Sequence, residues 1–177
     1  LIVSAIQFMP NDRPVLPNWY KNSLDRFITL INTHQKSGVV LMSGDVRFAE
    51  MLQHPCPDIV GYRSFHEFTS SGLTHSAFFL DLIDDLFPTY SRETDRYFGK
   101  NFGMIRFERA EGNTDPPNLV FEARNAEGNL VLRREVLYSD LVYDAALAAN
   151  FTGCVLPGPD DELSDLDEVF GKKKGGV

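Results

Sequence analysis

The chain has 177 residues, of which 43% are hydrophobic and 12% aromatic, so it is long enough to bury the core of one domain or of part of one. Its formal net charge of −8 argues against nucleic-acid binding, because phosphate binding requires a concentrated basic face and the sequence shows none. No apolar run approaches the roughly 20 residues that cross a bilayer, so no transmembrane segment is predicted.

The first eight residues, LIVSAIQF, are typical of a strand that is buried on both faces. Because a natural terminus rarely begins inside a buried strand, we interpret the sequence as a fragment or processed product. We therefore expect this strand to pair with another segment of the same protein or with another chain.

A helix is predicted after the proline-rich loop at residues 9–17. Asn18 can cap it, and apolar residues then recur at the spacing of one helix face. These residues are Tyr20, Leu24, Phe27, Ile28 and Ile31. A second strand follows at residues 38–42, so the first 45 residues predict a strand, a helix and a parallel strand. Asp45 would then lie at the carboxyl end of a strand, where functional groups gather in such folds.

Further along, residues 55–72 predict a strand, and residues 74–88 predict a helix that begins at Thr74 or Ser76 and stops at Pro88. Residues 101–109 and 118–138 alternate apolar and polar side chains, which predicts half-exposed antiparallel strands with a hairpin turn at residues 127–129. We divide the chain into one domain over residues 1–150 and an acidic tail over residues 151–177.

The two cysteines, Cys56 and Cys154, lie too far apart for a CxxC motif. They are either two buried thiols or one disulfide that ties the tail to the loop after Asp45. With the glycosylation sequon at Asn150 they favour a secretory, extracellular or endomembrane-lumen location.

The four histidines have different predicted surroundings. His34 ends the first helix and His54 lies in a proline-rich loop, so both are expected at the surface. His66 and His75 flank the sequence TSSG at residues 69–72. His75 could line a cleft with the serines of that turn, or it could simply make a local hydrogen bond beside a helix start. No nucleophile elbow, P-loop or dinucleotide-binding glycine motif is present.

Several segments resemble one known family in the expected order. The sequence SGDVRFAEM at residues 43–51 resembles the SGDVH signature of the alkaline phosphatase D (PhoD-like) branch of the calcineurin-type metallophosphatases. The segments IVSAIQFMPNDRP, HEFTSSGLTHS, NFGMIRFE and VLRREV resemble further blocks of that family. The resemblance covers about residues 1–141.

The resemblance implies an α/β fold of the sandwich type, the C-terminal half of a calcineurin-like metallophosphatase fold, with a mixed sheet, flanking helices and a terminal antiparallel hairpin. It implies hydrolysis of phosphate mono- or diesters at a site holding two metal ions of the Fe, Ca, Mn or Zn class. The earlier family motifs, which supply most metal ligands, have no counterpart in this sequence. The isolated chain is therefore expected to be inactive and to need an N-terminal half or another chain as its partner.

The resemblance places Asp45 on a metal-binding position, whereas a lone Asp after a strand would otherwise be a turn or cap residue. Arg47 stands where the family has histidine. A guanidinium has no lone pair for a metal ion, so Arg47 either contacts a phosphate, pairs with Asp45 in a bidentate bridge, or marks a degenerate site. Two function classes remain: part of a metal-dependent phosphatase or phosphodiesterase, or a non-catalytic interaction module descended from that family.

Overall fold

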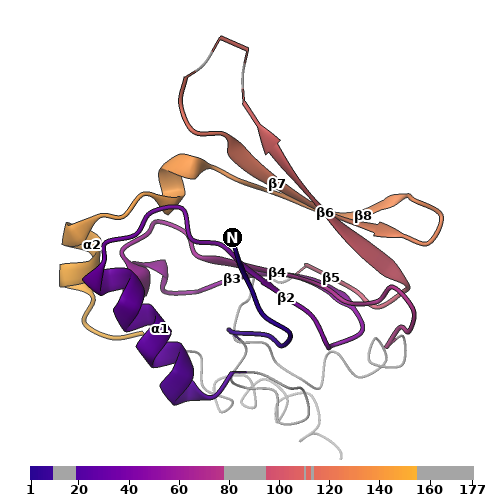
Figure 1. Ribbon diagram of the computed structural model, residues 1–177, viewed down its shortest axis with the longest axis horizontal. Helices are drawn as coiled ribbons and strands as arrows, with labels where there is room; N and C mark the ends of the chain where they lie inside the picture. Colours follow the sequence, from indigo (N-terminus) through magenta and orange to yellow (C-terminus); the bar gives the residue numbers. More distant parts are fainter. Residues whose placement is uncertain (10–18, 78–94, 110, 113, 155–177) are drawn as a thin grey trace, which may run out of the picture.

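The computed structural model of the chain describes residues 1–9, 19–77, 95–109, 111, 112 and 114–154, and these residues form two packed β-sheets with two α-helices (Figure 1). A three-stranded sheet covers one face of a five-stranded sheet, and helix α1 lies on the other side of the larger sheet (Figure 1). The fold is thus of mixed α and β type, with a mixed sheet and a separate antiparallel sheet.

The larger sheet has the strand order β1-β2-β4-β3-β5. Its members are β1 (Ile2–Val3), β2 (Leu41–Ser43), β3 (Ala49–Gln53), β4 (His66–Ser70) and β5 (Asp95–Tyr97). The pairs β1–β2 and β2–β4 are parallel, whereas β3 is antiparallel to both β4 and β5. The carboxyl ends of β1, β2 and β4 therefore meet at one edge of the sheet.

The smaller sheet is an antiparallel meander in which β7 (Asn118–Asn125) lies between β6 (Asn101–Glu108) and β8 (Leu130–Val136). The hairpin between β7 and β8 turns at Gly128, whose φ of +85° suits glycine, and Asn125 Oδ1 accepts a hydrogen bond from Asn129 N at 2.8 Å. The predicted antiparallel strands and their turn are confirmed.

Helix α1 (Lys21–Thr33) connects the two parallel strands β1 and β2, as the sequence predicts. Leu24, Ile28 and Ile31 lie on its buried face, because residues three and four apart share one side of a helix. Its N-cap is Tyr20 and not Asn18, which lies outside the described residues. Tyr20 itself is 86% exposed, so the predicted apolar face begins one turn later.

The two sheets pack through apolar side chains on one face of β3 and β4. The rings of Phe68 and Phe121 lie 5.2 Å apart between centroids, one from each sheet. Gly103 of β6 is required at this contact, since a Cβ there would lie 2.8 Å from Phe68 Cε1. One apolar core therefore joins α1, the larger sheet and the smaller sheet.

The prediction for the opening segment is wrong in part. Only Ile2 and Val3 are in a strand; β1 is at the edge of the five-stranded sheet, and Val3 is 73% exposed. Burial begins later, at Gln7, Phe8 and Met9. The run is apolar, yet its first residues are not enclosed on both faces by the described part of the chain.

Strand β3 was not predicted, because Glu50 interrupts its apolar pattern even though that side chain is completely buried. The predicted helix at residues 74–88 lies mostly outside the described residues, and residues 74–77 within them are not helical.

At the C-terminal end, Tyr138–Leu141 and Ala145–Asn150 form a 3₁₀ helix and helix α2. Cys154 is then joined to Cys56 by a disulfide whose Cα atoms lie 5.8 Å apart, which decides between the two alternatives left by the sequence. The remainder of the predicted acidic tail, residues 155–177, lies outside the described part of the chain. Among the described helices none is long and apolar enough to cross a membrane.

Candidate functional site

Three loops converge where the parallel strands end. They are the segment after β1, the β2–β3 loop that contains Asp45 and Arg47, and the turn after β4. Gly44 belongs to the β2–β3 loop and lies close to both of the other segments. A Cβ on it would be 3.4 Å from the carbonyl oxygen of Ala5, after β1, and 3.7 Å from Ser71 Cβ, after β4. The segment after β1, the β2–β3 loop and the turn after β4 are therefore neighbours in space.

The β2–β3 loop has an unusual backbone. Asp45 has a φ of +69° and Arg47 a φ of +63°, so two non-glycine residues in a row of three adopt the left-handed region. Between and after them, Val46 and Phe48 are 1% and 2% exposed and pack into a small second core. The alternation holds the buried pair inward and leaves Asp45 and Arg47 exposed. Strained conformations of this kind persist where the surrounding structure imposes them, and they concentrate at functional sites.

Hydrogen bonds to the turn after β4 hold the loop in place. Arg47 N donates to Ser71 Oγ at 2.6 Å, and Ser71 N donates to the carbonyl oxygen of Phe48 at 3.2 Å. On the other side Ala77 N donates to the carbonyl oxygen of Arg47 at 3.0 Å. The serine hydroxyl that could have lined a cleft thus serves to fix the backbone of Arg47.

The side chains of Asp45 and Arg47 point their charges into solvent. Within the described part of the chain neither forms an ion pair or a side-chain hydrogen bond, so the bidentate Asp45–Arg47 bridge is wrong as an expectation. The carboxylate of Asp45 and the guanidinium of Arg47 are therefore both accessible to solvent.

Beneath the loops lies a buried polar network on the face of the larger sheet that is turned away from the smaller sheet. Gln7 Nε2 donates to Glu50 Oε2 at 2.8 Å and to Thr69 Oγ1 at 3.1 Å, and Thr69 Oγ1 lies 2.7 Å from Ser43 Oγ. Ser43 and Thr69 lie at the ends of β2 and β4, next to the loops. The network therefore braces the strand ends that present Asp45.

Two buried glutamates complete this network. Glu50 is 0% exposed and accepts a hydrogen bond from Arg96 Nε at 2.7 Å. Glu67 accepts from Phe8 N at 2.9 Å and Met9 N at 2.7 Å, which ties the chain after β1 to β4. Burial raises the pKa of Glu67 to about 7, and the nearby charge of Glu50 adds to this rise. The hydrogen bonds from Ser43 and from the two backbone amides act in the opposite direction and lower the pKa. Sequence analysis missed both glutamates, and the only available signal was a Glu inside each apolar strand pattern.

The histidines and the second serine lie elsewhere. His75 is exposed, with Nδ1 3.0 Å from Thr74 Oγ1, which is the local hydrogen bond that the sequence allowed. Ser70 Oγ donates to Asn101 Oδ1 at 2.9 Å, between the sheets. His66 lies at the opposite end of β4. His54 is 3% exposed, so its predicted surface position is wrong, whereas His34 is exposed as predicted.

The two exposed loop residues differ in their suitability as ligands of a metal ion. Asp45 is suitable by chemistry and exposure, since hard cations prefer carboxylate oxygens. Arg47 is not suitable, because its guanidinium has no lone pair. Within the described ranges no three His, Cys, Asp or Glu side chains lie close enough to hold one ion together. The described residues thus offer a single ligand and do not form a complete metal site.

Comparison of the chain with models of known protein families gives no match, and neither curated proteins nor solved structures give a significant match. The class defined by the fold and the loops is a mixed α/β domain with polar loops at the carboxyl ends of parallel strands.

Proposed function

We propose that this chain is the C-terminal part of a metal-dependent phosphoesterase domain of the alkaline phosphatase D type, and that it contributes one metal ligand, Asp45, to a shared site. The observation that carries the proposal is the position of Asp45. It is exposed at the carboxyl ends of three parallel strands, in a left-handed conformation imposed by a hydrogen-bonded loop. That is the place where strand-end carboxylates bind ligands in sheets of this kind.

In the proposed site Asp45 would hold one of two metal ions, of the Fe, Ca, Mn or Zn class. When bound, such ions polarise the phosphoryl oxygens and activate a water molecule. Arg47 lies two residues away, is exposed and cannot ligate metal. Its guanidinium would instead donate hydrogen bonds to the phosphate oxygens of the ester. The buried network of Gln7, Glu50 and Thr69 would keep the strand ends in position.

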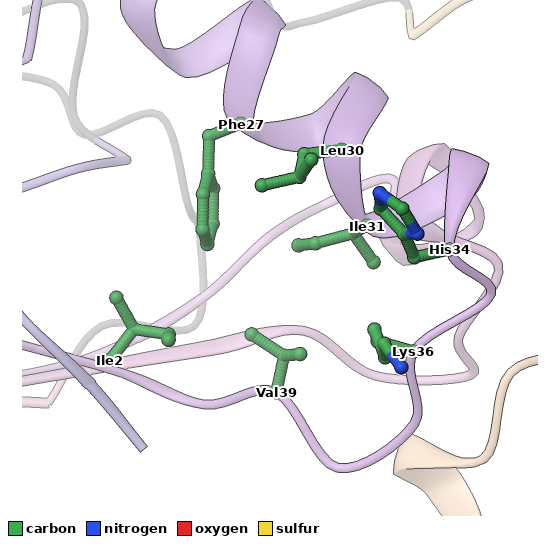
Figure 2. A pocket seen from close by; sticks show the side chains of 7 residues that line it. All are labelled: Ile2, Phe27, Leu30, Ile31, His34, Lys36 and Val39. Atoms are coloured by element: carbon green, nitrogen blue, oxygen red, sulfur yellow. The ribbon is translucent and has the colours of Figure 1, made fainter.

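The proposal includes a partner that supplies the missing ligands, either an N-terminal half of the same protein or another chain. An apolar hollow of about 390 Å³ beside the edge strand β1 is a suitable contact surface. Figure 2 shows Phe27, Leu30 and Ile31 of α1 facing Ile2 and Val39 across it, with His34 and Lys36 at one end. Packing of a further apolar segment here would cover surface that β1 leaves open to solvent.

A hydrolysis assay on two forms of the protein tests the proposal. The chain of 177 residues is incubated with p-nitrophenyl phosphate or its bis-ester and with Mn²⁺, Ca²⁺, Zn²⁺ or Fe³⁺, and no turnover above background is expected. Arg47→His should not restore activity in this form, because one added imidazole does not complete the ligand set. The longest protein that the gene encodes should hydrolyse one of the esters. Absence of activity in that longer protein with all four metals would contradict the proposal.

A second candidate function follows from Arg47 itself. If the exposed guanidinium marks a site that has lost metal binding, the fold serves as a non-catalytic interaction module. The sequence encoded before Leu1 discriminates between the two functions. Aspartate, asparagine and histidine ligands in family order favour the enzyme, and their replacement by residues without lone pairs favours the module.

A further inference from the structure

The glycosylation sequon at Asn150 lies at the end of helix α2, close to the last described residue of the chain. Asn150, Phe151 and Thr152 give the required order of asparagine, a residue other than proline, and a hydroxyl residue. No other asparagine of the sequence is followed by serine or threonine at this spacing. Such a triplet also arises by chance, so its surroundings in the fold decide whether it can be modified.

The asparagine and the hydroxyl residue both face solvent. Asn150 and Thr152 are exposed, and within the described part of the chain neither side chain forms a hydrogen bond. Gly153 follows with a φ of +132°, and a Cβ placed on it would meet no described heavy atom within 4 Å. Open space therefore surrounds the triplet, and the side-chain nitrogen of Asn150 is accessible for a covalent bond.

Helix α2 does not hold Asn150 tightly. The helix has six residues, none of which is buried, and Asp144 caps it at the other end by accepting a hydrogen bond from Ala146 N. Helices shorter than about 12–15 residues are marginal on their own. At the end that carries the triplet, Phe151 N donates to the carbonyl oxygen of Ala148 at 3.4 Å, which is longer than a usual hydrogen bond. The last turn can therefore open and allow an enzyme to enclose the three residues.

The disulfide gives independent evidence on the compartment. Cys154 follows the triplet closely and is joined to Cys56, which lies 98 residues away. Disulfides form and persist in oxidising compartments such as the lumen of the endoplasmic reticulum. N-linked sugars belong to surface segments of proteins that enter the same secretory route. The disulfide and the sequon thus point to one compartment, although they are separate features of the chain.

We propose that Asn150 carries an N-linked oligosaccharide. The donor is an oligosaccharide bound to a polyisoprenyl diphosphate, and a transferase of the compartment catalyses the step. The side-chain nitrogen of Asn150 forms a bond to the anomeric carbon of the sugar and loses one proton to the medium. The bond between that carbon and the diphosphate oxygen breaks, and the polyisoprenyl diphosphate leaves with the electron pair.

The sugar extends from the end of the domain that lies opposite Asp45. Asp144, at the start of α2, donates its backbone N–H to the carbonyl oxygen of Gly61 at 2.8 Å, and Gly61 belongs to the connection from β3 to β4. That connection lies at the amino end of β4, whereas the loop of Asp45 contacts the turn at the carboxyl end. Figure 1 shows α2 at the outer edge of the molecule. The proposal therefore does not depend on the phosphoesterase function and leaves the edge at Asp45 open.

Mass measurement of protein purified from its native source tests the proposal directly. After proteolysis, the peptide that contains Asn150 should be heavier than its sequence mass by one oligosaccharide. Peptide N-glycosidase should remove the sugar and leave aspartate in place of the asparagine. Detection of this peptide at its unmodified mass alone would overturn the proposal.

Variants produced in the same cells assign the modification to this triplet. Asn150→Gln and Thr152→Ala should each yield only the unmodified peptide, whereas Thr152→Ser keeps the hydroxyl and should retain the sugar. The matched control Asn22→Gln changes an exposed asparagine of α1 outside any sequon and should retain the sugar at full occupancy. A sugar that remains on the peptide in Asn150→Gln or Thr152→Ala lies on another residue and would contradict the proposal. Equal loss in Asn22→Gln would also contradict the assignment to Asn150.

Discussion

Arg47 is held in a backbone conformation that costs free energy for any residue with a Cβ. Left-handed φ values of non-glycine residues cost about 1–2 kcal/mol each, less for Asp, whose short side chain tolerates them. Arg47→Gly should therefore raise the free energy of unfolding by about 0.5–1 kcal/mol, as measured in urea. The matched control Arg47→Ala retains the strained backbone and should change stability by less than about 0.5 kcal/mol. If Arg47→Gly instead loses as much stability as Arg47→Ala, or more, the prediction is wrong. The arginine side chain would then be what stabilises the loop.

Two buried histidines make the fold sensitive to acid. Burial lowers the pKa of His54 and of His66 from 6.5 to about 4. The unfolded chain takes up these protons near pH 6.5 and the folded chain only near pH 4, so stability is lost as the pH falls through this window. Each histidine should lower the free energy of unfolding by about 2 kcal/mol between pH 7 and pH 5. His54→Asn and His66→Asn should each remove that part of the loss in urea unfolding at the two pH values.

Glu67 acts in the opposite direction. Its pKa rises from 4.5 to about 7 on folding, so the folded chain retains a proton that the unfolded chain has lost, and the associated stability disappears as the pH rises from 4.5 through 7. Glu67→Gln should therefore make the loss of stability on acidification larger. A Glu67→Gln variant with a smaller loss than the unmodified chain would show that Glu67 is ionised in the folded state at pH 5.

At the scale of the elements, the close approach of β6 to β4 leaves no room for a side chain at residue 103. A Cβ on Gly103 would lie 2.8 Å from Phe68 Cε1 and 2.9 Å from Ser70 Cβ, so the strands would have to separate. Gly103→Ala should lower the free energy of unfolding by about 1–3 kcal/mol. Met104→Ala on the neighbouring, partly exposed position is the control and should cost much less. Equal effects of the two substitutions in thermal unfolding would contradict the packing described for this contact.

Elements with a regular apolar period were predictable, and those that depend on long-range partners were not. Helix α1 and the hairpin around Gly128 follow from local spacing and turn chemistry, and the structure confirms both. Strand β3 was missed because the burial of Glu50 depends on Gln7 and Arg96, which are distant in sequence. The same reason explains His54, whose burial comes from Phe65 and the strands around it and not from its proline-rich neighbourhood.

The candidate site was predicted in part. The sequence placed Asp45 at the carboxyl end of a strand, and β2 ends at Ser43, two residues before it. That Asp45 lies beside the turn after β4 was not predicted. The left-handed backbone of the loop and the polar network below it could not be predicted, because both depend on the pairing of strands with one another. The metal role of Asp45 and the phosphate role of Arg47 stay predictions.

At the scale of the whole molecule, the disulfide joins the segment after β3 to the C-terminal end of the described part of the chain. Cys56 and Cys154 are 98 residues apart, and closing so long a loop stabilises the folded state by about 4–5 kcal/mol in the chain-entropy model. Protein purified from its native source should show no free thiol by alkylation and mass measurement, and the double variant Cys56→Ser, Cys154→Ser should lose stability of that order. Two alkylated cysteines would refute the bridge and remove the support that it gives to a secretory, extracellular or lumenal location.

We propose that the edge of the sheet at Asp45 is half of a metal site, and metal content measured together with activity tests this most directly. The longest protein that the gene encodes is purified with bound metal, and its Asp45→Ala variant is compared with the exposed control Asp25→Ala on α1. We predict that Asp45→Ala loses metal and at least about 100-fold in ester hydrolysis, since even groups that only support a ligand often cost 10–100-fold. Asp25→Ala should change neither. Full metal content and activity in Asp45→Ala, with the protein folded, would contradict the account.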